Sequence, residues 1–169
     1  MSFARAAEHL ENYTAGHETK TRAVGPERID YPDDHVEVDN RLSWFLGSLA
    51  RRYDETETFY VHLTRDAREV AESYLRRWDS VFRSSIVRAF GHGVLIRNED
   101  WPMNDRREVV HQYVQTINDN ITEFLCTRES MTIDITELSD RFADFAERIG
   151  GIYDQTAVQV TLARHHNAS

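Results

Sequence analysis

Residues 59–78 have the sequence FYVHLTRDAREVAESYLRRW, and this stretch decides how the rest of the chain is interpreted. Its first half is a short apolar run with aromatic and β-branched members, which is typical of a buried strand. Its second half has apolar residues at helical spacing, namely Val70, Ala71, Tyr74, Leu75 and Trp78. The period therefore changes from strand to helix near Arg65, and the stretch predicts half of a βαβ unit.

The start of the predicted helix is marked by its capping residues. Asp66 suits the N-cap, and Glu69, three residues on, suits the partner in a capping box. Arg65 is thereby placed at the carboxyl end of the strand, the edge at which open α/β sheets bind ligands. Ser73 lies about two turns into the helix. Spacing alone does not decide whether Arg65 and Ser73 reach the same ligand.

Residues 65–74, RDAREVAESY, resemble the segment by which sulfotransferases hold the 3′-phosphate of 3′-phosphoadenosine 5′-phosphosulfate. In that family an arginine at the strand end and a serine eight positions later both contact this phosphate, and Arg65 and Ser73 match them. The resemblance implies transfer of a sulfuryl group from this donor to a hydroxyl or amine acceptor. The alternative is an ordinary strand–helix junction with a solvated arginine.

The length and composition of the chain indicate how many domains it has and which kinds of partner and location are expected. The chain has 169 residues, of which 40% are hydrophobic, and this predicts a single domain covering residues 1–169. The net charge of −9 argues against non-specific binding to nucleic acid. No apolar run is long enough to cross a bilayer, the N-terminus lacks the apolar core of a signal peptide, and the single Cys126 fits a reducing compartment. We therefore expect a cytoplasmic protein without a membrane span.

The beginning of the chain departs from the sulfotransferase pattern. Residues 2–10 predict a short helix, whereas the resemblance implies a preceding strand and a loop with Gly, Ser or Thr that grips the 5′-phosphosulfate. None of the seven glycines lies in such a context. Either the chain is truncated inside the loop or a natural member has lost it, and the intact later segment favours truncation. Met1 falls about where the loop would end, which makes Ser2 a candidate cofactor contact.

Candidate acceptor-side residues lie in the first quarter of the chain. Residues 12–34 are polar and turn-rich, and they predict a surface loop over an acceptor site. His17 and Glu18 in this loop are candidates for the base that accepts the acceptor's proton, and the alternative is a solvated pair. Residues 35–39 alternate as a short strand, and Asp39 suits the cap of the helix after it, while the resemblance also makes Asp39 a candidate acceptor-side group. The resemblance adds Arg41 to these candidates.

The second half of the chain extends the resemblance with less specificity. A long amphipathic helix is predicted for residues 104–125, a strand for 131–135 and a helix that stops at Gly150. Since some sulfotransferases use a basic C-terminal loop, Arg164 is a candidate cofactor contact, although the Arg-Lys-Gly form of that loop is absent.

Metal chemistry is not indicated by the sequence. The eight histidines have no metalloprotease-type spacing, and the one cysteine has no partner. His92, between two glycines, is at most a weak site candidate. We therefore predict no metal.

Together these features predict a three-layer α/β/α fold with a parallel sheet, similar to the P-loop sulfotransferases but lacking their first strand. The expected ligands are the donor nucleotide and an acceptor that the sequence does not specify. A second hypothesis is a catalytically silent nucleotide-binding or interaction module on the same fold. A kinase of the related folds is disfavoured because no Gly-x-x-x-x-Gly-Lys-Ser/Thr loop is present.

Overall fold

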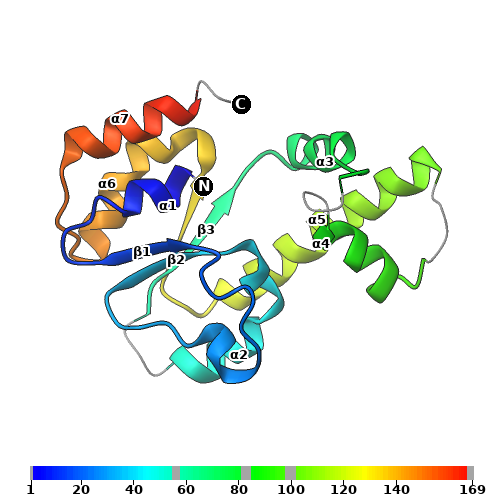
Figure 1. The fold of residues 1–169 in the computed structure, drawn as a ribbon, viewed down its shortest axis with the longest axis horizontal. Coiled ribbons are helices and arrows are strands. Elements are labelled where there is room, and N and C mark those ends of the chain that lie inside the picture. The colour runs from blue at the N-terminus through cyan, green and yellow to red at the C-terminus, as the bar shows by residue number, and fades with distance from the viewer. Residues whose placement is uncertain (1, 55–57, 81–84, 98–101, 167–169) are drawn as a thin grey trace. The chain divides into compact units, whose positions relative to one another are not determined.

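The computed structural model describes residues 2–54, 58–80, 85–97 and 102–166, apart from the side chains of residues 164–166. The chain divides into two compact units (Figure 1). Unit 1 consists of Met1–Leu63 and Thr127–Ser169, and unit 2 consists of Thr64–Cys126. The protein is a mixed α/β protein that is mostly helical.

Four short strands form two parallel pairs. In the first pair β1 (Thr14–His17) runs beside β2 (His35–Val38), with Thr14 opposite His35 and His17 opposite Val38. In the second pair β3 (Tyr60–Thr64) runs beside β4 (Ser130–Asp134). β2 is therefore hydrogen-bonded to β1 and not to β3. A single sheet in three layers, as expected from the sequence, stays a prediction.

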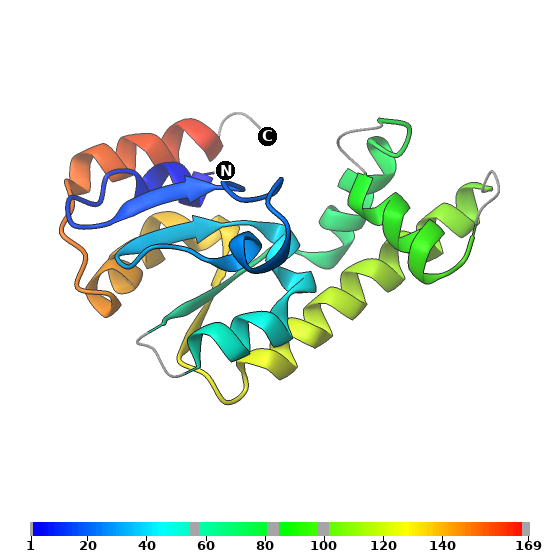
Figure 2. The ribbon, with the colours of Figure 1, turned by 60° about the horizontal axis from the view of Figure 1, so that its bottom comes forward.

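Three helices of unit 1 share one core with these strands. α1 (Ser2–Ala7), α6 (Leu138–Arg148) and α7 (Gln155–His166) lie together beside the strands (Figure 2). The buried members of this core are Phe3, Ala6, Ala7, Leu10, Ile133, Leu138, Phe142, Phe145, Ala146, Val158 and Leu162. The strands contribute Ala15, Val36, Val38, Val61, Leu63 and Met131 to its margin. Since both strand pairs pack against the same cluster, the helices hold them in one hydrophobic unit.

A second group of elements in unit 1 lies between and after the strands of the first pair. It contains two 3₁₀ helices, η1 (Gly25–Ile29) and η2 (Asn40–Trp44), and the helix α2 (Leu46–Tyr53). The phenolic oxygen of Tyr53 donates to the carbonyl of Ile29 at 2.6 Å and accepts from the amide of Tyr31 at 2.9 Å. These bonds fasten the loop between β1 and β2 onto α2.

The end of α2 is tied to the chain that leads into β4. Arg128 donates from Nε and Nη2 to the two carboxylate oxygens of Asp54, at 2.8 and 2.7 Å. These hydrogen bonds hold the pKa of Asp54 below its usual range. Two parts of unit 1 that are distant in sequence are thereby joined by a bidentate ion pair.

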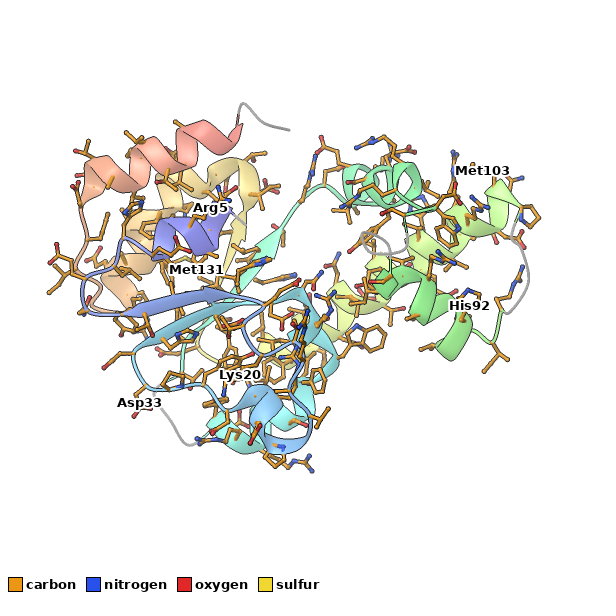
Figure 3. The ribbon with its side chains drawn as sticks, viewed as in Figure 1. Arg5, Lys20, Asp33, His92, Met103 and Met131 are labelled. Atoms are coloured by element: carbon orange, nitrogen blue, oxygen red, sulfur yellow. The ribbon has the colours of Figure 1, made fainter. Side chains whose placement is uncertain are left out.

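Apart from Thr64 at the end of β3, the regular elements in the described part of unit 2 are helices. It contains α3 (Ala67–Arg76), α4 (Ser85–Ala89), a π-helical turn η3 (Phe90–Val94) and α5 (Met103–Leu125). Its core has the buried members Ala71, Trp78, Val87, Phe90, Val109, Val110, Tyr113 and Val114. His92 lies exposed in the π-helical turn (Figure 3). The units thus have separate cores, and the single domain expected for residues 1–169 stays a prediction.

Several elements agree with the sequence and one does not. The strand before Arg65, the helix after Asp66 and the long helix up to Leu125 are confirmed. The interpretation of the whole of residues 12–34 as a loop was wrong, because Thr14–His17 forms β1. This strand has no β-branched pattern of its own, and it exists through its hydrogen bonds to β2.

Candidate functional site

The carboxyl edge of the first strand pair brings two candidate residues together. Glu18 follows β1 directly and Asp39 follows β2, and His17 is paired in register with Val38. The amide of Glu18 donates to the carbonyl of Val38 at 3.0 Å. Because parallel strands end on the same side of a sheet, both acidic residues lie at the edge where α/β proteins commonly bind ligands.

Asp39 has both of its carboxylate oxygens occupied. Oδ1 accepts from the backbone N–H of Arg41 at 2.8 Å, which caps η2 as expected from the sequence. Oδ2 accepts from Nη2 of Arg28 at 2.5 Å, and the carboxylate of Asp39 is fully buried. Both oxygens are therefore engaged in contacts that cap η2 and hold the guanidinium of Arg28. This arrangement favours a structural role for Asp39.

Arg28 is the buried cation of this edge, with 5% of its surface exposed. Its Nη1 donates to the hydroxyl of Tyr31 at 3.2 Å, and its guanidinium lies 5.0 Å from the ring centroid of Phe45. Burial lowers the pKa of Arg28, but the hydrogen bonds and charges of Asp39 and Tyr31 outweigh it and leave the pKa raised. The guanidinium therefore stays charged.

Tyr31 has an environment that suppresses ionisation. Burial and then the negative charge of Glu37 raise its pKa to about 12, against the opposing effect of Arg28. Its ring stacks on that of His35 with 5.8 Å between the centroids, and the Nζ of Lys20 lies 5.8 Å from the centroid of the Tyr31 ring. Tyr31 is thus a neutral hydrogen-bonding group at neutral pH.

A second polar network covers the start of the same strand pair. His35 places Nδ1 2.8 Å from the hydroxyl of Thr14 and Nε2 3.1 Å from the carboxylate of Glu37. Glu37 also accepts from the amide and the hydroxyl of Thr19, at 2.8 and 2.6 Å. These contacts hold the chain after β1 against β2, and nothing in the local sequence pattern marks their partners.

Glu18 and His17 differ in the contacts that their side chains make. Glu18 has a φ of +55°, the left-handed region that is costly for a residue with a side chain, and Nη1 of Arg41 donates to its Oε1 at 2.6 Å. His17 is exposed, and its side chain makes no hydrogen bond or ion pair with the described residues. His17 is therefore the candidate at this edge whose side chain has no polar partner among the described residues.

The candidate donor-binding residues Arg65 and Ser73 lie at α3. The carboxylate of Asp66 accepts from the amides of Arg68 and Glu69, both at 3.0 Å, so the predicted N-cap is confirmed. The carboxylate of Glu69, expected in a capping box, instead accepts from Nε of Arg65 at 2.8 Å.

Ser73 has a different partner from Arg65. Nη2 of Arg77 donates to the hydroxyl oxygen of Ser73 at 3.0 Å, and Nε of Arg77 donates to its carbonyl at 2.9 Å. The hydroxyl hydrogen of Ser73 is not used in these bonds and can be donated to a ligand. Arg65, with 36% of its side chain exposed, is accessible from solvent.

The remaining candidates are at the two ends of the described chain. Ser2 is the first residue of α1 and is half-buried. Arg164 belongs to α7, and its side chain lies outside the described part of the structure. The predicted residues are thus divided, with His17, Glu18, Asp39, Ser2 and Arg164 in unit 1 and Arg65 and Ser73 in unit 2.

The described residues show neither a metal-binding group nor a membrane-spanning helix. Within them, no three His, Cys, Asp or Glu residues are grouped so that they could hold a metal ion. None of the helices in this part of the chain has the length and apolar character needed to cross a membrane. Arg65 and Arg68, at the start of α3, are exposed arginines that could hold a phosphate. Comparisons with protein-family models, with curated proteins and with solved structures found no match to this chain.

Proposed function

We propose that the chain is a sulfotransferase-like protein that holds the 3′-phosphate of 3′-phosphoadenosine 5′-phosphosulfate at the β3–α3 junction. The observation that carries the proposal is the placement of Arg65 between the end of β3 and the capped start of α3. The guanidinium of Arg65 favours a phosphate there, because its Nε pairs with Glu69 and its two Nη groups make no hydrogen bond with the described residues. In this proposal Ser73 donates its hydroxyl hydrogen to the same phosphate while Arg77 holds its oxygen.

The proposal extends to the fold and to the acceptor side. We place both strand pairs in one parallel sheet of a three-layer fold, which the shared core of the two pairs supports. The strand and the loop that would bind the 5′-phosphosulfate are not among the 169 residues. His17 is the preferred base for the acceptor's proton, because Asp39 and Glu18 are each paired with an arginine.

A calorimetric titration with adenosine 3′,5′-bisphosphate tests the donor site. We expect Arg65→Ala to weaken binding at least tenfold and Ser73→Ala severalfold, since each removes a phosphate contact. Arg76→Ala is the matched control, because it removes the same charge from the exposed last turn of the same helix, and it should change the affinity less than twofold.

Binding of a second nucleotide, which lacks the 3′-phosphate, shows how much this group contributes to the affinity. Adenosine 5′-monophosphate lacks this group, so it should bind more weakly than the bisphosphate to the unaltered chain and equally weakly to Arg65→Ala. If Arg65→Ala lowered the affinity for both nucleotides by the same factor, the proposal would be wrong. It would also be wrong if the unaltered chain showed no saturable binding of the bisphosphate.

The alternative function is a catalytically silent nucleotide-binding module that would use the same donor site at α3. It predicts bisphosphate binding by the 169-residue chain without transfer of labelled sulfuryl groups. Transfer that appears after an N-terminal strand and loop are added, and disappears with Arg65→Ala, would support the enzyme instead.

A further inference from the structure

A shallow hollow opens at the beginning of α2 in unit 1. It has a volume of about 320 Å³ and is lined by Trp44, Phe45, Gly47, Ser48 and Arg51. This volume is at the lower end of the range for sites that bind small molecules. Phe45 also contacts Arg28 at the edge of the first strand pair, and the other lining residues belong neither to that edge nor to the donor site described above.

The local sequence explains why these residues share one hollow. Trp44, Ser48 and Arg51 follow one another at spacings of four and three residues, which places them on the same side of the helical segment. Gly47 contributes no side chain, and a Cβ atom built there would meet no atom within 4 Å. The space beside Gly47 is therefore open to an added side chain.

The walls of the hollow combine aromatic surface with an available cation. Trp44 is 42% exposed, and Phe45 carries the buried guanidinium of Arg28 5.0 Å from its ring centroid. Arg51 is exposed, and its guanidinium has no hydrogen bond, ion pair or ring contact with the described residues. Its neighbour Arg52, by contrast, donates to Asp30 at 3.0 Å and stacks on Tyr53.

We propose that this hollow binds a small aromatic carboxylate. The ring would lie against Trp44 and Phe45, because aromatic rings gain from stacked or edge contacts beyond their buried area. The carboxylate would pair with Arg51, whose planar guanidinium offers two parallel N–H donors, and would accept the hydroxyl hydrogen of Ser48. The inference is independent of the proposed sulfotransferase function, since it uses other residues and another ligand.

Titration of the full chain with 2-naphthoate, followed by calorimetry or by NMR shifts, tests this site. We expect saturable binding with a dissociation constant in the millimolar range or below. Arg51→Ala should weaken it at least fivefold. Arg52→Ala, which removes the same charge from the next position of α2, should change it less than twofold.

Gly47→Leu provides a steric test of the same site. A Cβ atom at position 47 would meet no atom within 4 Å, so the longer side chain would extend into the hollow, and leucine favours a helix more than glycine does. We expect this variant to melt no lower than the unaltered chain and to lose 2-naphthoate binding.

Three results would overturn the proposal. Equal weakening by Arg51→Ala and Arg52→Ala would show a general effect of charge. Equal affinity for cyclohexanecarboxylate and 2-naphthoate would show that no aromatic wall is involved. Undiminished binding by folded Gly47→Leu would place the ligand elsewhere, and if that variant does not fold, the comparison of Arg51 with Arg52 still decides.

Discussion

At the scale of single residues, the pair of Arg28 and Asp39 is the most consequential contact in unit 1. Both side chains are buried, with 6% and 0% of their surface exposed. Loss of one partner from such a pair leaves a buried charge without compensation, which is far more costly than the loss of an exposed pair. Asp39 also caps η2, so its carboxylate connects the loop after β1 to the helix after β2.

We predict that Asp39→Ala lowers the free energy of unfolding by about 3–5 kcal/mol. The double variant Arg28→Met with Asp39→Ala should lose less than the sum of the single variants, with a coupling of about 0.5–3 kcal/mol in urea unfolding. The exposed pair of Arg52 and Asp30 is the matched control, with an expected coupling of about 0–1 kcal/mol. Additive losses at positions 28 and 39 would contradict the prediction.

Tyr31 leads to a prediction about alkaline pH. Its pKa is raised from 10.0 to about 12 by burial and by the charge of Glu37, so the folded state holds the phenolic proton more tightly than the unfolded state. This contribution to stability is complete below pH 10.0 and is lost as the pH rises to about 12.

The ultraviolet absorbance of tyrosinate measures this effect. The difference between the titrations of the unaltered chain and Tyr31→Phe should be one tyrosine that ionises near pH 12. The fall in stability above pH 10.0 should also be shallower in the variant. A difference titration centred on the ordinary value of 10.0 would contradict this expectation.

At the scale of helices and strands, the sequence predicts best where the signal is local. The junction at Arg65 was predictable because the apolar period changes there and because Asp66 is a suitable cap, and both the strand and the cap are present. The long helix ending at Leu125 was predictable from a repeated apolar face after Pro102.

Elements that depend on distant partners were not predictable. β1 has the sequence TAGH, which contains no strand pattern, and its backbone is ordered by pairing with β2 across the intervening loop. The burial of Arg28 depends on Asp39, Tyr31 and Phe45, and an arginine in a turn-rich stretch carries no sign of this. Glu69 was assigned to a capping box by spacing, but the guanidinium of Arg65 competes for the same carboxylate.

The candidate site was predictable only in part for the same reason. Glu18 and Asp39 were selected as single residues, and the parallel register of β1 and β2 places them at one edge. The sequence did not indicate that each of these carboxylates has an arginine partner. Ion pairs between residues 11 and 23 positions apart cannot be read from local spacing.

At the scale of the whole molecule, each unit has its own buried cluster of apolar residues. Phe142 is 1% exposed in unit 1, and Val110 is fully buried in unit 2. We predict that Phe142→Ala costs about 3–5 kcal/mol and reduces amide hydrogen-exchange protection within unit 1. Val110→Ala should reduce protection within unit 2. Equal loss of protection in both units from either substitution would favour the single cooperative domain expected from the sequence.

Because unit 1 is built from two separate segments of the chain, its core is completed later during synthesis than the core of unit 2. Unit 2 is one continuous segment, so all of its core residues have been made once Ile117 is added. The core of unit 1 joins Phe3 to Phe145 and to Leu162, which is near the end of the chain. At about 5–20 residues per second, the first helix waits roughly 8–30 s for these partners. During this interval the apolar face of α1 is a site at which a chaperone could bind the nascent chain.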